Sequence, residues 1–387
     1  MMDFGITDRQ FRERYFEKQP WLFRAALSER PIGWSELDQL LYQIEPTPAG
    51  MQLFHGGLVP ADSYVQEVLE FGQRRRRLNK IRFYGHMRSG ATLVINRLET
   101  HSPQARRLCV DIARFSGQPT TGNAYLSFTG EGTFGKHWDT HDVFAVQLIG
   151  RKRWQLFAPT LPLPLAHQTS ERSEVPCPAV PVMDCVLETG DVLYVPRGWW
   201  HQVIPLQEGS LHFSVGTYAA TVQDYLTWLC SRVVPSLVAG RAALDETSDE
   251  SLSTVMQALS AAAADPKLRR EFDDSLAAKE VPTSEFNCDL FLNRRQPILD
   301  SNAFLRLNTR ATPDAQGRLF ANGGMLQLDI VSASIVRLLA ISGPRTLLEV
   351  TSQLREVPQD AVHRAVLDLI GREVLTAEDK QATTKSA

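Results

Sequence analysis

The chain has 387 residues, of which 43% are hydrophobic and 22% are charged. This balance is typical of globular proteins, and the length suffices for two or three domains of ~100–200 residues each. The net charge of −3 excludes a strong overall field that would favour nucleic acid or an anionic membrane as partner. The start of the chain lacks a signal-peptide pattern, no apolar run approaches the ~20 residues that span a bilayer, and the five cysteines form no CxxC pair. We therefore expect a cytoplasmic protein with reduced thiols and no membrane partner.

The first 120 residues predict a region with several helices. Apolar residues recur at helical spacing in three segments, and in the first of them Phe11 and Tyr15 lie four residues apart on one face. Ser102-Pro103 is typical of a helix start, with proline at the first helical position. The three expected helices cover residues 8–16, 35–44 and 102–116.

Arg74–Arg77 form the one dense basic run of the sequence. Two interpretations stay open for it, a contact with RNA and the solvated end of a helix. A short charge run is weak evidence for nucleic-acid binding when it stands alone. The helix end is therefore the preferred interpretation, and direct nucleic-acid binding is not expected.

Short strand-like segments replace the helical pattern from residue 121 onward. Turn residues such as Gly130, Gly150 and Gly190 separate them. Many short strands without helices between them indicate an antiparallel jelly roll of the cupin kind, which is a double-stranded β-helix. The stretch 159–183 is rich in proline and lacks periodicity, so we expect a long loop that shapes a substrate site. The expected strands cover 123–129, 143–149, 153–158, 185–188, 191–195, 202–205 and 211–217.

The pattern becomes helical again over residues 221–280. Thr221 and the acidic residue three positions later form a capping-box-like start. The run 252–264 is rich in alanine, leucine and methionine, and two outcomes are equally compatible with it: packing within its own domain, or packing against a second subunit.

The last part of the chain predicts a further unit from residue 285 onward. A hairpin or short strand is expected at 323–329, and the elements that follow resemble a winged-helix arrangement. The polar residues of the last helix mix both charge signs, which favours a docking or oligomer-supporting role over DNA reading. The expected helices cover 332–341, 345–354 and 358–371.

Two separated motifs carry the candidate chemistry. His137-Trp138-Asp139 places a histidine and a carboxylate two residues apart, so both side chains point the same way on an extended segment. A Gly-Asp turn and the strand Asp191–Val195 lead to His201, which would return beside the first pair. Two histidines and one aspartate can occupy one face of an iron octahedron and leave three positions open, which is the facial triad of non-haem Fe(II) oxygenases. Zinc can also bind such a set.

A buried cation is expected next to this triad. Period-2 alternation places Lys152 on the same inward face as Trp154 and Leu156, while Arg153 faces water. A buried ammonium without a partner would cost several kcal/mol, so Lys152 should meet an anion. The positive metal site attracts an anionic chelating co-substrate. A carboxylate at the far end of that co-substrate would meet Lys152, and the hydroxyl of Tyr125 could reach the same carboxylate. In barrels of this kind the usual co-substrate is 2-oxoglutarate.

Together these residues resemble the JmjC oxygenases, and within them the ribosomal oxygenase branch that hydroxylates ribosomal proteins. The resemblance implies Fe(II) bound by His137, Asp139 and His201, with the 2-oxoglutarate C5 carboxylate held by Lys152 and Tyr125, and O2 as oxidant. It also implies an α+β chain with a JmjC/cupin double-stranded β-helix core, and a homodimer that acts on a ribosomal protein. The order of domains would be 1–220 for the JmjC/cupin-like oxygenase domain with N-terminal helical elements, 221–284 for a helical dimerisation region and 285–387 for a winged-helix-like domain.

Other functions remain compatible with the same residues. Within the enzymes, these are a peptide-tailoring oxygenase and a lysine demethylase. Outside them, the barrel could be a non-catalytic metal-binding cupin that serves as a binding module. His212 is the alternative third ligand, and His201 is preferred because it follows a turn from which a side chain can reach the mouth of the barrel.

Overall fold

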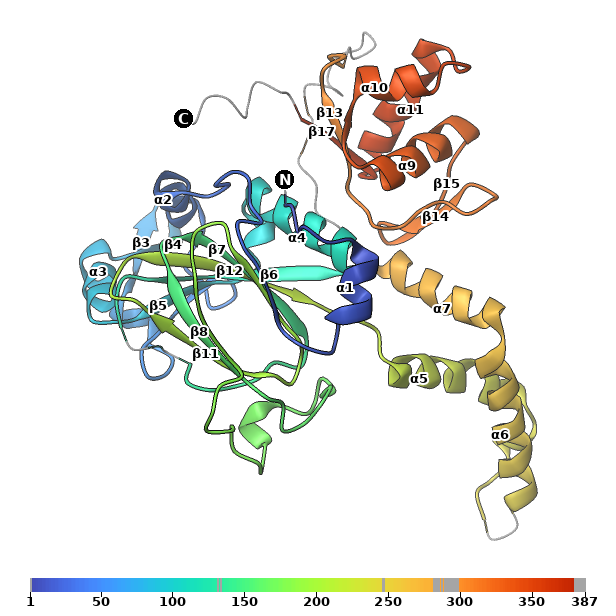
Figure 1. The fold of residues 1–387 in the computed structure, drawn as a ribbon, viewed down its shortest axis with the longest axis horizontal. Helices are drawn as coiled ribbons and strands as arrows, with labels where there is room; N and C mark the ends of the chain where they lie inside the picture. The colour runs from blue at the N-terminus through green and yellow to red at the C-terminus, as the bar shows by residue number, and fades with distance from the viewer. Residues whose placement is uncertain are drawn as a thin grey trace. The chain divides into compact units, whose positions relative to one another are not determined.

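The computed structural model describes residues 2–130, 132, 134–245, 248–280, 286, 288 and 299–378. The chain divides into two compact units, Met1–Tyr218 and Ala219–Ala387. Figure 1 shows the ribbon of both units, which are taken one at a time below. No helix among the described residues is long and apolar enough to cross a membrane.

The first unit is built around two antiparallel sheets (Figure 1). The larger has the order β1-β10-β7-β12-β6-β5-β2, and the smaller has the order β11-β8-β9. This arrangement confirms the expected cupin barrel of short antiparallel strands. The strands of the larger sheet are β1 (Trp21–Phe23), β2 (Met51–Phe54), β5 (Thr92–Ile95), β6 (Thr120–Ser127), β7 (Asp142–Ile149), β10 (Val192–Val195) and β12 (Ser210–Thr217). Those of the smaller sheet are β8 (Lys152–Phe157), β9 (Met183–Leu187) and β11 (Trp200–Pro205).

Burial along the strands follows from their sequences. All eight residues of β7 are buried, as expected for a nearly continuous apolar run in the middle of a sheet. In β8, Lys152 and Trp154 are buried while Arg153 is exposed, so the predicted alternation is confirmed. Strand β11 pairs with β8 so that His201 lies opposite Leu156. The pairing therefore brings His201 next to the strand that carries Lys152.

Four helices lie in the described part of this unit, and the apolar face of two of them completes its core. Phe11 of α1 and Phe115 of α4 have ring centroids 4.9 Å apart, and Phe11 lies 5.7 Å from Phe144 of β7. The start of α4 has Ser102 as N-cap, which accepts from the Ala105 amide, as the Ser-Pro signal predicts. The helices are α1 (Asp8–Arg14), α2 (Trp34–Gln43), α3 (Lys80–Arg88) and α4 (Pro103–Ser116).

The basic run Arg74–Arg77 lies in a strand, so its interpretation as a helix end was wrong. It forms most of β4 (Gln73–Leu78), which pairs with β3 (Val65–Glu70) in a two-stranded hairpin. Cross-strand charge pairing explains the difference, because Glu67 contacts Arg74 and Arg76. A run of like charges has no periodicity of its own, and its structure is decided by the strand that precedes it.

The expected long loop is confirmed between β8 and β9. Apart from one 3₁₀ turn at Ser170–Arg172, residues 158–182 contain no helix or strand. Further 3₁₀ turns lie at Ala61–Ser63, Leu98–Thr100, Val234–Ser236 and Ala239–Arg241.

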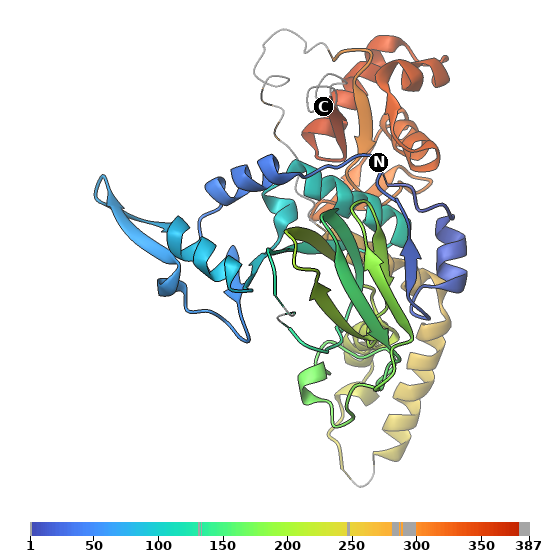
Figure 2. The ribbon, with the colours of Figure 1, turned by 60° about the vertical axis from the view of Figure 1, so that its left-hand side comes forward.

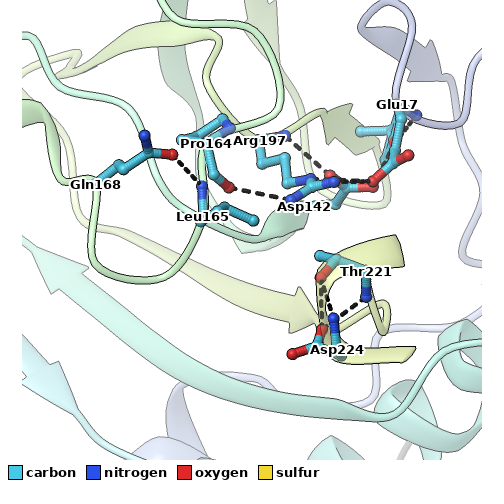
Figure 3. A network of polar contacts seen from close by, with 9 residues as sticks. Glu17, Asp142, Pro164, Leu165, Gln168, Arg197, Thr221 and Asp224 are labelled. Atoms are coloured by element: carbon cyan, nitrogen blue, oxygen red, sulfur yellow. Dashed lines mark hydrogen bonds and ion pairs between the residues drawn. The ribbon is translucent and has the colours of Figure 1, made fainter. Parts of the chain in front are cut away.

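The second unit begins with three helices. Thr221 and Asp224 form a capping box at the start of α5, as predicted, and Figure 3 shows its contacts. A small apolar cluster of Tyr225, Leu229 and Phe272 joins α5 to α7. The helices are α5 (Val222–Val233), α6 (Asp249–Ala264) and α7 (Pro266–Lys279).

A separate hydrophobic core holds the rest of this unit together. The expected hairpin is present as β14 and β15, which turn at Asn322 and Gly323, and the three expected helices follow within a few residues of their predicted bounds. Residues 281–284 of the predicted dimerisation region, and residues 285, 287, 289–298 and 379–387 of the predicted third domain, lie outside the described part. The elements are β13 (Phe304–Leu307), β14 (Arg318–Ala321), β15 (Gly324–Gln327), α9 (Ile330–Ser342), β16 (Arg345–Thr346), α10 (Leu347–Gln353), α11 (Gln359–Gly371) and β17 (Leu375–Glu378).

Candidate metal centre

The fold brings His137, Asp139 and His201 together. The backbones of His137 and His201 form an isolated antiparallel bridge, with N···O distances of 3.1 and 2.7 Å. The candidate ligand atoms of the three residues all lie within 4.8 Å of one another, and His201 Nε2 lies 3.7 Å from Asp139 Oδ2. His137 and Asp139 are half-buried, and His201 is buried. The donor set is therefore compact and reachable from one side.

Hydrogen bonds orient both imidazoles toward a common point. His201 Nδ1 donates to the carbonyl of Trp199 at 3.1 Å, and His137 Nδ1 donates to the carbonyl of Gly135 at 3.3 Å. Each bond fixes a tautomer in which the Nε2 lone pair is free. Burial, followed by the neighbouring His137, lowers the pKa of His201 to about 4, so this ring is neutral at physiological pH. Two imidazoles and one carboxylate fit the ligand set that Fe(II) takes in a facial triad.

A tight turn holds the third candidate ligand in place. Gly198 has φ +82°, and its amide donates to the carbonyl of Asp139 at 2.9 Å. A Cβ atom at this position would lie 2.6 Å from the carbonyl oxygen of Leu161, so only glycine fits. The turn between β10 and β11 therefore fixes the backbone beside Asp139 immediately before the chain reaches His201.

Lys152 is buried beside the triad, as the alternation of β8 predicts, with 2% of its surface exposed. Its Nζ donates to the carbonyl of Tyr125 at 2.9 Å and to Nδ1 of His212 at 3.0 Å. Both partners are neutral, and burial lowers the pKa of the Lys152 ammonium to about 7. The structure thus places His212 against Lys152 and outside the group formed by the two histidines and Asp139.

A cavity of about 110 Å³ connects these groups. Tyr125 lines it from β6, with its ring stacked on His212 at 4.8 Å. Burial, followed by the charge of Asp139, raises the pKa of Tyr125 to about 12, so its hydroxyl stays a hydrogen-bond donor. The cavity is lined by Thr92, Tyr125, Ser127, Gly132, Phe134, His137, Asp139, Val143, Lys152, Trp154, His201, Val203, Pro205, His212 and Ser214. Its walls therefore carry the triad, a buried lysine and a tyrosine hydroxyl.

A buried polar network behind the triad was not anticipated from the sequence. Asp142, at the start of β7, accepts from the Tyr194 hydroxyl at 2.7 Å and from the Arg197 amide at 2.9 Å. The Arg197 guanidinium donates to Glu17 at 2.7 Å and to the carbonyl of Pro164 at 3.0 Å (Figure 3). The network ties the N-terminal segment and the long loop to the strands that carry the triad. The one local signal was a carboxylate opening an otherwise apolar strand.

The Asp142 carboxylate makes folding stability depend on pH. Burial raises its pKa to about 6, so its charged form is disfavoured in the folded protein. The contribution of Asp142 to stability therefore decreases as pH rises through the interval from about 4 to about 6. As pH rises from about 4 to about 6, we expect the free energy of unfolding of Asp142→Asn to increase by up to about 3 kcal/mol relative to that of wild type. Urea unfolding of both proteins at a series of pH values measures this difference, and parallel pH profiles would contradict the assignment.

Comparison with known proteins finds one matching domain and several similar proteins. Residues 95–225 match the JmjC domain. The chain is 29% identical over 239 residues to the bifunctional lysine-specific demethylase and histidyl-hydroxylase NO66 of Drosophila persimilis. The aligned segment covers 60% of this chain and 33% of the fly protein. It is 27% identical over 229 residues to ribosomal oxygenase 2 of Rattus norvegicus, covering 56% of this chain and 47% of the rat protein. The chain thus spans less than half of these curated relatives.

Solved structures of Escherichia coli YcfD show the same fold. The structure of this ribosomal oxygenase in complex with cobalt and 2-oxoglutarate has a TM-score of 0.59 and 16% sequence identity, covering 98% of this chain and 100% of the bacterial one. A second structure, in complex with cobalt and succinic acid, gives a TM-score of 0.58 at 17% identity. At such low sequence identity the structural likeness establishes the fold alone.

Proposed function

We propose that the chain, whose residues 95–225 match the JmjC domain, is an Fe(II)- and 2-oxoglutarate-dependent dioxygenase of the ribosomal oxygenase kind that hydroxylates a side chain of a ribosomal protein. The observation that carries this proposal is the cavity that holds a His-Asp-His group together with a buried lysine. The relatives named as histidyl-hydroxylase and ribosomal oxygenase, and the YcfD complex with cobalt and 2-oxoglutarate, support the same chemistry. We place this activity in the cytoplasm.

Each site residue has a distinct role in this proposal. His137 and His201 present imidazole nitrogens, and Asp139 presents the carboxylate oxygens that complete the ligand set of a divalent ion. Lys152 and Tyr125 hold the distant carboxylate of 2-oxoglutarate, one as a cation and the other as a protonated hydroxyl. When bound, Fe(II) supplies the activation of O2, coupled to conversion of 2-oxoglutarate to succinate and CO2, that inserts one oxygen atom into a C–H bond.

The buried walls of the cavity support this chemistry by excluding water. Trp154 and Val143 line the cavity and are almost completely buried. Trp154 also stacks on the His201 ring, with centroids 5.9 Å apart, and so restricts its orientation. A dry and rigid site keeps the co-substrate oxidation coupled to the intended C–H bond.

Turnover on ribosomes tests the proposal. Ribosomal particles from a strain that lacks this gene are incubated with the purified protein, Fe(II), 2-oxoglutarate and O2, and the ribosomal proteins are weighed by intact-protein mass spectrometry. We expect one ribosomal protein to gain one oxygen atom while succinate is formed. Succinate formation without any gain would reject the ribosomal substrate, and loss of a methyl group would identify a demethylase. Absence of both succinate and product would favour a non-catalytic binding module.

We further propose that the second unit has two parts, a helical dimerisation region over residues 221–284 and a winged-helix-like domain over 285–387. None of the residues of α6 is buried, and Leu252 and Met256, four positions apart on one face, are 50% and 63% exposed. An exposed apolar stripe of this kind is typical of a helix that packs on a partner. The mixed charges of α11 suit docking or support of the dimer better than DNA reading.

Placing charge on this stripe is expected to separate the dimer. The double variant Leu252→Glu/Met256→Glu should elute as a monomer of 43.4 kDa, whereas wild type should have twice that mass. Two buried glutamates at an interface would cost several kcal/mol, on the order of the penalty for an unpaired buried charge. Light scattering after size exclusion measures the mass. Ser253→Glu/Gln257→Glu, at neighbouring exposed positions, is the matched control and should remain dimeric. A monomeric wild type would refute the dimer.

A further inference from the structure

The β3–β4 hairpin is exposed on both faces. Four of the six residues of β3 and five of the six of β4 are exposed, and the other three are half-buried. Figure 2 shows this light-blue hairpin projecting from the barrel. A two-stranded ribbon of this kind buries too little apolar surface to be stable by itself, and it adds little to the core of its unit. Its length and position therefore call for an explanation other than packing.

Positive charge is concentrated on this hairpin and on the helix that follows it. Residues 65–88 contain seven of the 41 arginines and lysines of the chain but two of its 44 acidic residues, which gives +5 within a total of −3. The remainder of the chain thus carries −8. Glu67 and Glu70 pair with Arg74, Arg76 and Arg77, and this pairing leaves most of the positive charge uncompensated. A local excess of this size attracts a polyanion even though the whole chain is acidic.

The loop at the tip of the hairpin holds an aromatic residue against the preference of its backbone. Phe71 and Gly72 form a two-residue connection with φ +49° and +79°, and positive φ at both positions is the requirement of a type I′ turn. Asparagine, aspartate or glycine is favoured at the first of these positions, and a bulky residue is unfavourable there. The Phe71 side chain is also fully exposed, at 108% of its reference area. Neither turn formation nor burial accounts for a phenylalanine at this place.

We propose that the β3–β4 hairpin is a binding surface for single-stranded RNA, with its arginines on the phosphates and Phe71 stacked on a base. Exposed aromatic rings beside arginines are how proteins bind unpaired nucleotides, because every base has a face on which a ring can stack. An acidic protein segment would satisfy the arginines equally well but would give no role to an exposed ring. The choice of RNA also rests on the proposed function, since a ribosomal protein is presented to an enzyme among ribosomal RNA.

The position of the hairpin in the chain links it to the candidate metal centre. From β4 the chain enters α3 at Lys80, and from α3 it enters β5, whose first residue, Thr92, lines the cavity. Two elements thus connect the RNA surface to a wall of the site. RNA held by the hairpin would therefore raise the local concentration of a protein side chain that is bound to the same particle.

Binding of a labelled single-stranded RNA to the full-length protein tests this proposal, without iron or 2-oxoglutarate. Fluorescence anisotropy at about 50 mM and about 200 mM salt gives the affinity and its salt dependence. We expect Arg75→Gln/Arg77→Gln to weaken binding at least about tenfold and to reduce the salt slope by about 1.4, or about 0.7 for each phosphate that is no longer neutralised. Arg9→Gln/Arg12→Gln on α1 removes the same amount of charge at exposed positions and should bind as wild type does.

Phe71→Asn separates stacking from charge and from folding. Asparagine suits positive φ, so the melting temperature should not fall, while removal of the ring should weaken RNA binding about fivefold or more. Unchanged affinity in this variant, together with displacement of the RNA by polyglutamate at equal charge, would show that the hairpin recognises negative charge alone and would overturn the proposal. Wild-type affinity in the double arginine variant would also overturn it. Because the measurement involves no turnover, its failure leaves the oxygenase assay untouched.

Discussion

His137→Ala is expected to lose iron and to reduce conversion of 2-oxoglutarate to background. The ring is half-buried, and its backbone pairing with His201 involves only main-chain atoms, so alanine keeps the bridge between the two segments. What disappears is one of the three donors that lie within 4.8 Å of one another. Removal of an outer partner of a metal ligand costs 10–100-fold, so removal of the ligand itself should cost more than about a hundredfold in iron affinity.

His141→Ala is the matched control for this experiment. His141 is a half-buried histidine two residues beyond Asp139, its ring stacks on Tyr218 at 4.9 Å, and it lies outside the three-residue group. Iron content by elemental analysis and succinate formation should both be retained in this variant. A His137→Ala protein that keeps wild-type iron content would remove His137 from the metal centre, and unchanged unfolding curves for both variants would show that the fold is intact.

Local patterns accounted for the barrel and for the placement of the candidate site. Alternation along β8 predicts that Lys152 and Trp154 point inward, because a strand places successive side chains on opposite faces whatever its neighbours are. The HxD motif and the histidine after the Gly-Asp turn likewise carry their geometry in a few residues. These are the parts of the molecule in which the short-range sequence determines the direction of a side chain.

The features that the sequence did not indicate all depend on distant partners. Glu17 donates its amide to the Tyr194 hydroxyl across 177 positions, and Arg197 reaches Glu17 across 180. The strand character of Arg74–Arg77 is set by the opposing β3, and the three-residue β1 exists because it pairs with β10. An ion pair, a buried network or a short edge strand has no periodic signature, so only the folded chain reveals it.

The buried Lys152 predicts that affinity for 2-oxoglutarate decreases as pH rises above about 7. In the free protein, burial between two neutral acceptors holds the pKa of this ammonium near that value. A carboxylate bound beside it favours the charged form and raises the pKa, so binding takes up a proton whenever the amine is neutral. Affinity should be greatest below pH 7 and should fall by up to about tenfold per pH unit above it, until the raised pKa of the complex is reached.

Substitution of this lysine separates its charge from other pH effects. Lys152→Met keeps the length of the side chain and removes the ammonium, and we expect a roughly hundredfold larger dissociation constant at pH 7, the order of a missing charged hydrogen bond. The variant should also show no pH dependence above pH 7, because His201, with a pKa of about 4, is already neutral there. Arg153→Met, on the exposed side of the same strand, is the control and should bind as wild type does.

Calorimetric titration of 2-oxoglutarate in buffers of different ionisation enthalpy measures affinity and proton uptake in the same experiment. Uptake of a proton by wild type above pH 7, absent from Lys152→Met, would identify Lys152 as the group that becomes charged on binding. Affinity that stays constant with pH in wild type would mean that the bound dianion does not contact the ammonium. The lysine would then be a structural donor to Tyr125 and His212, and the co-substrate carboxylate would require another partner in the cavity.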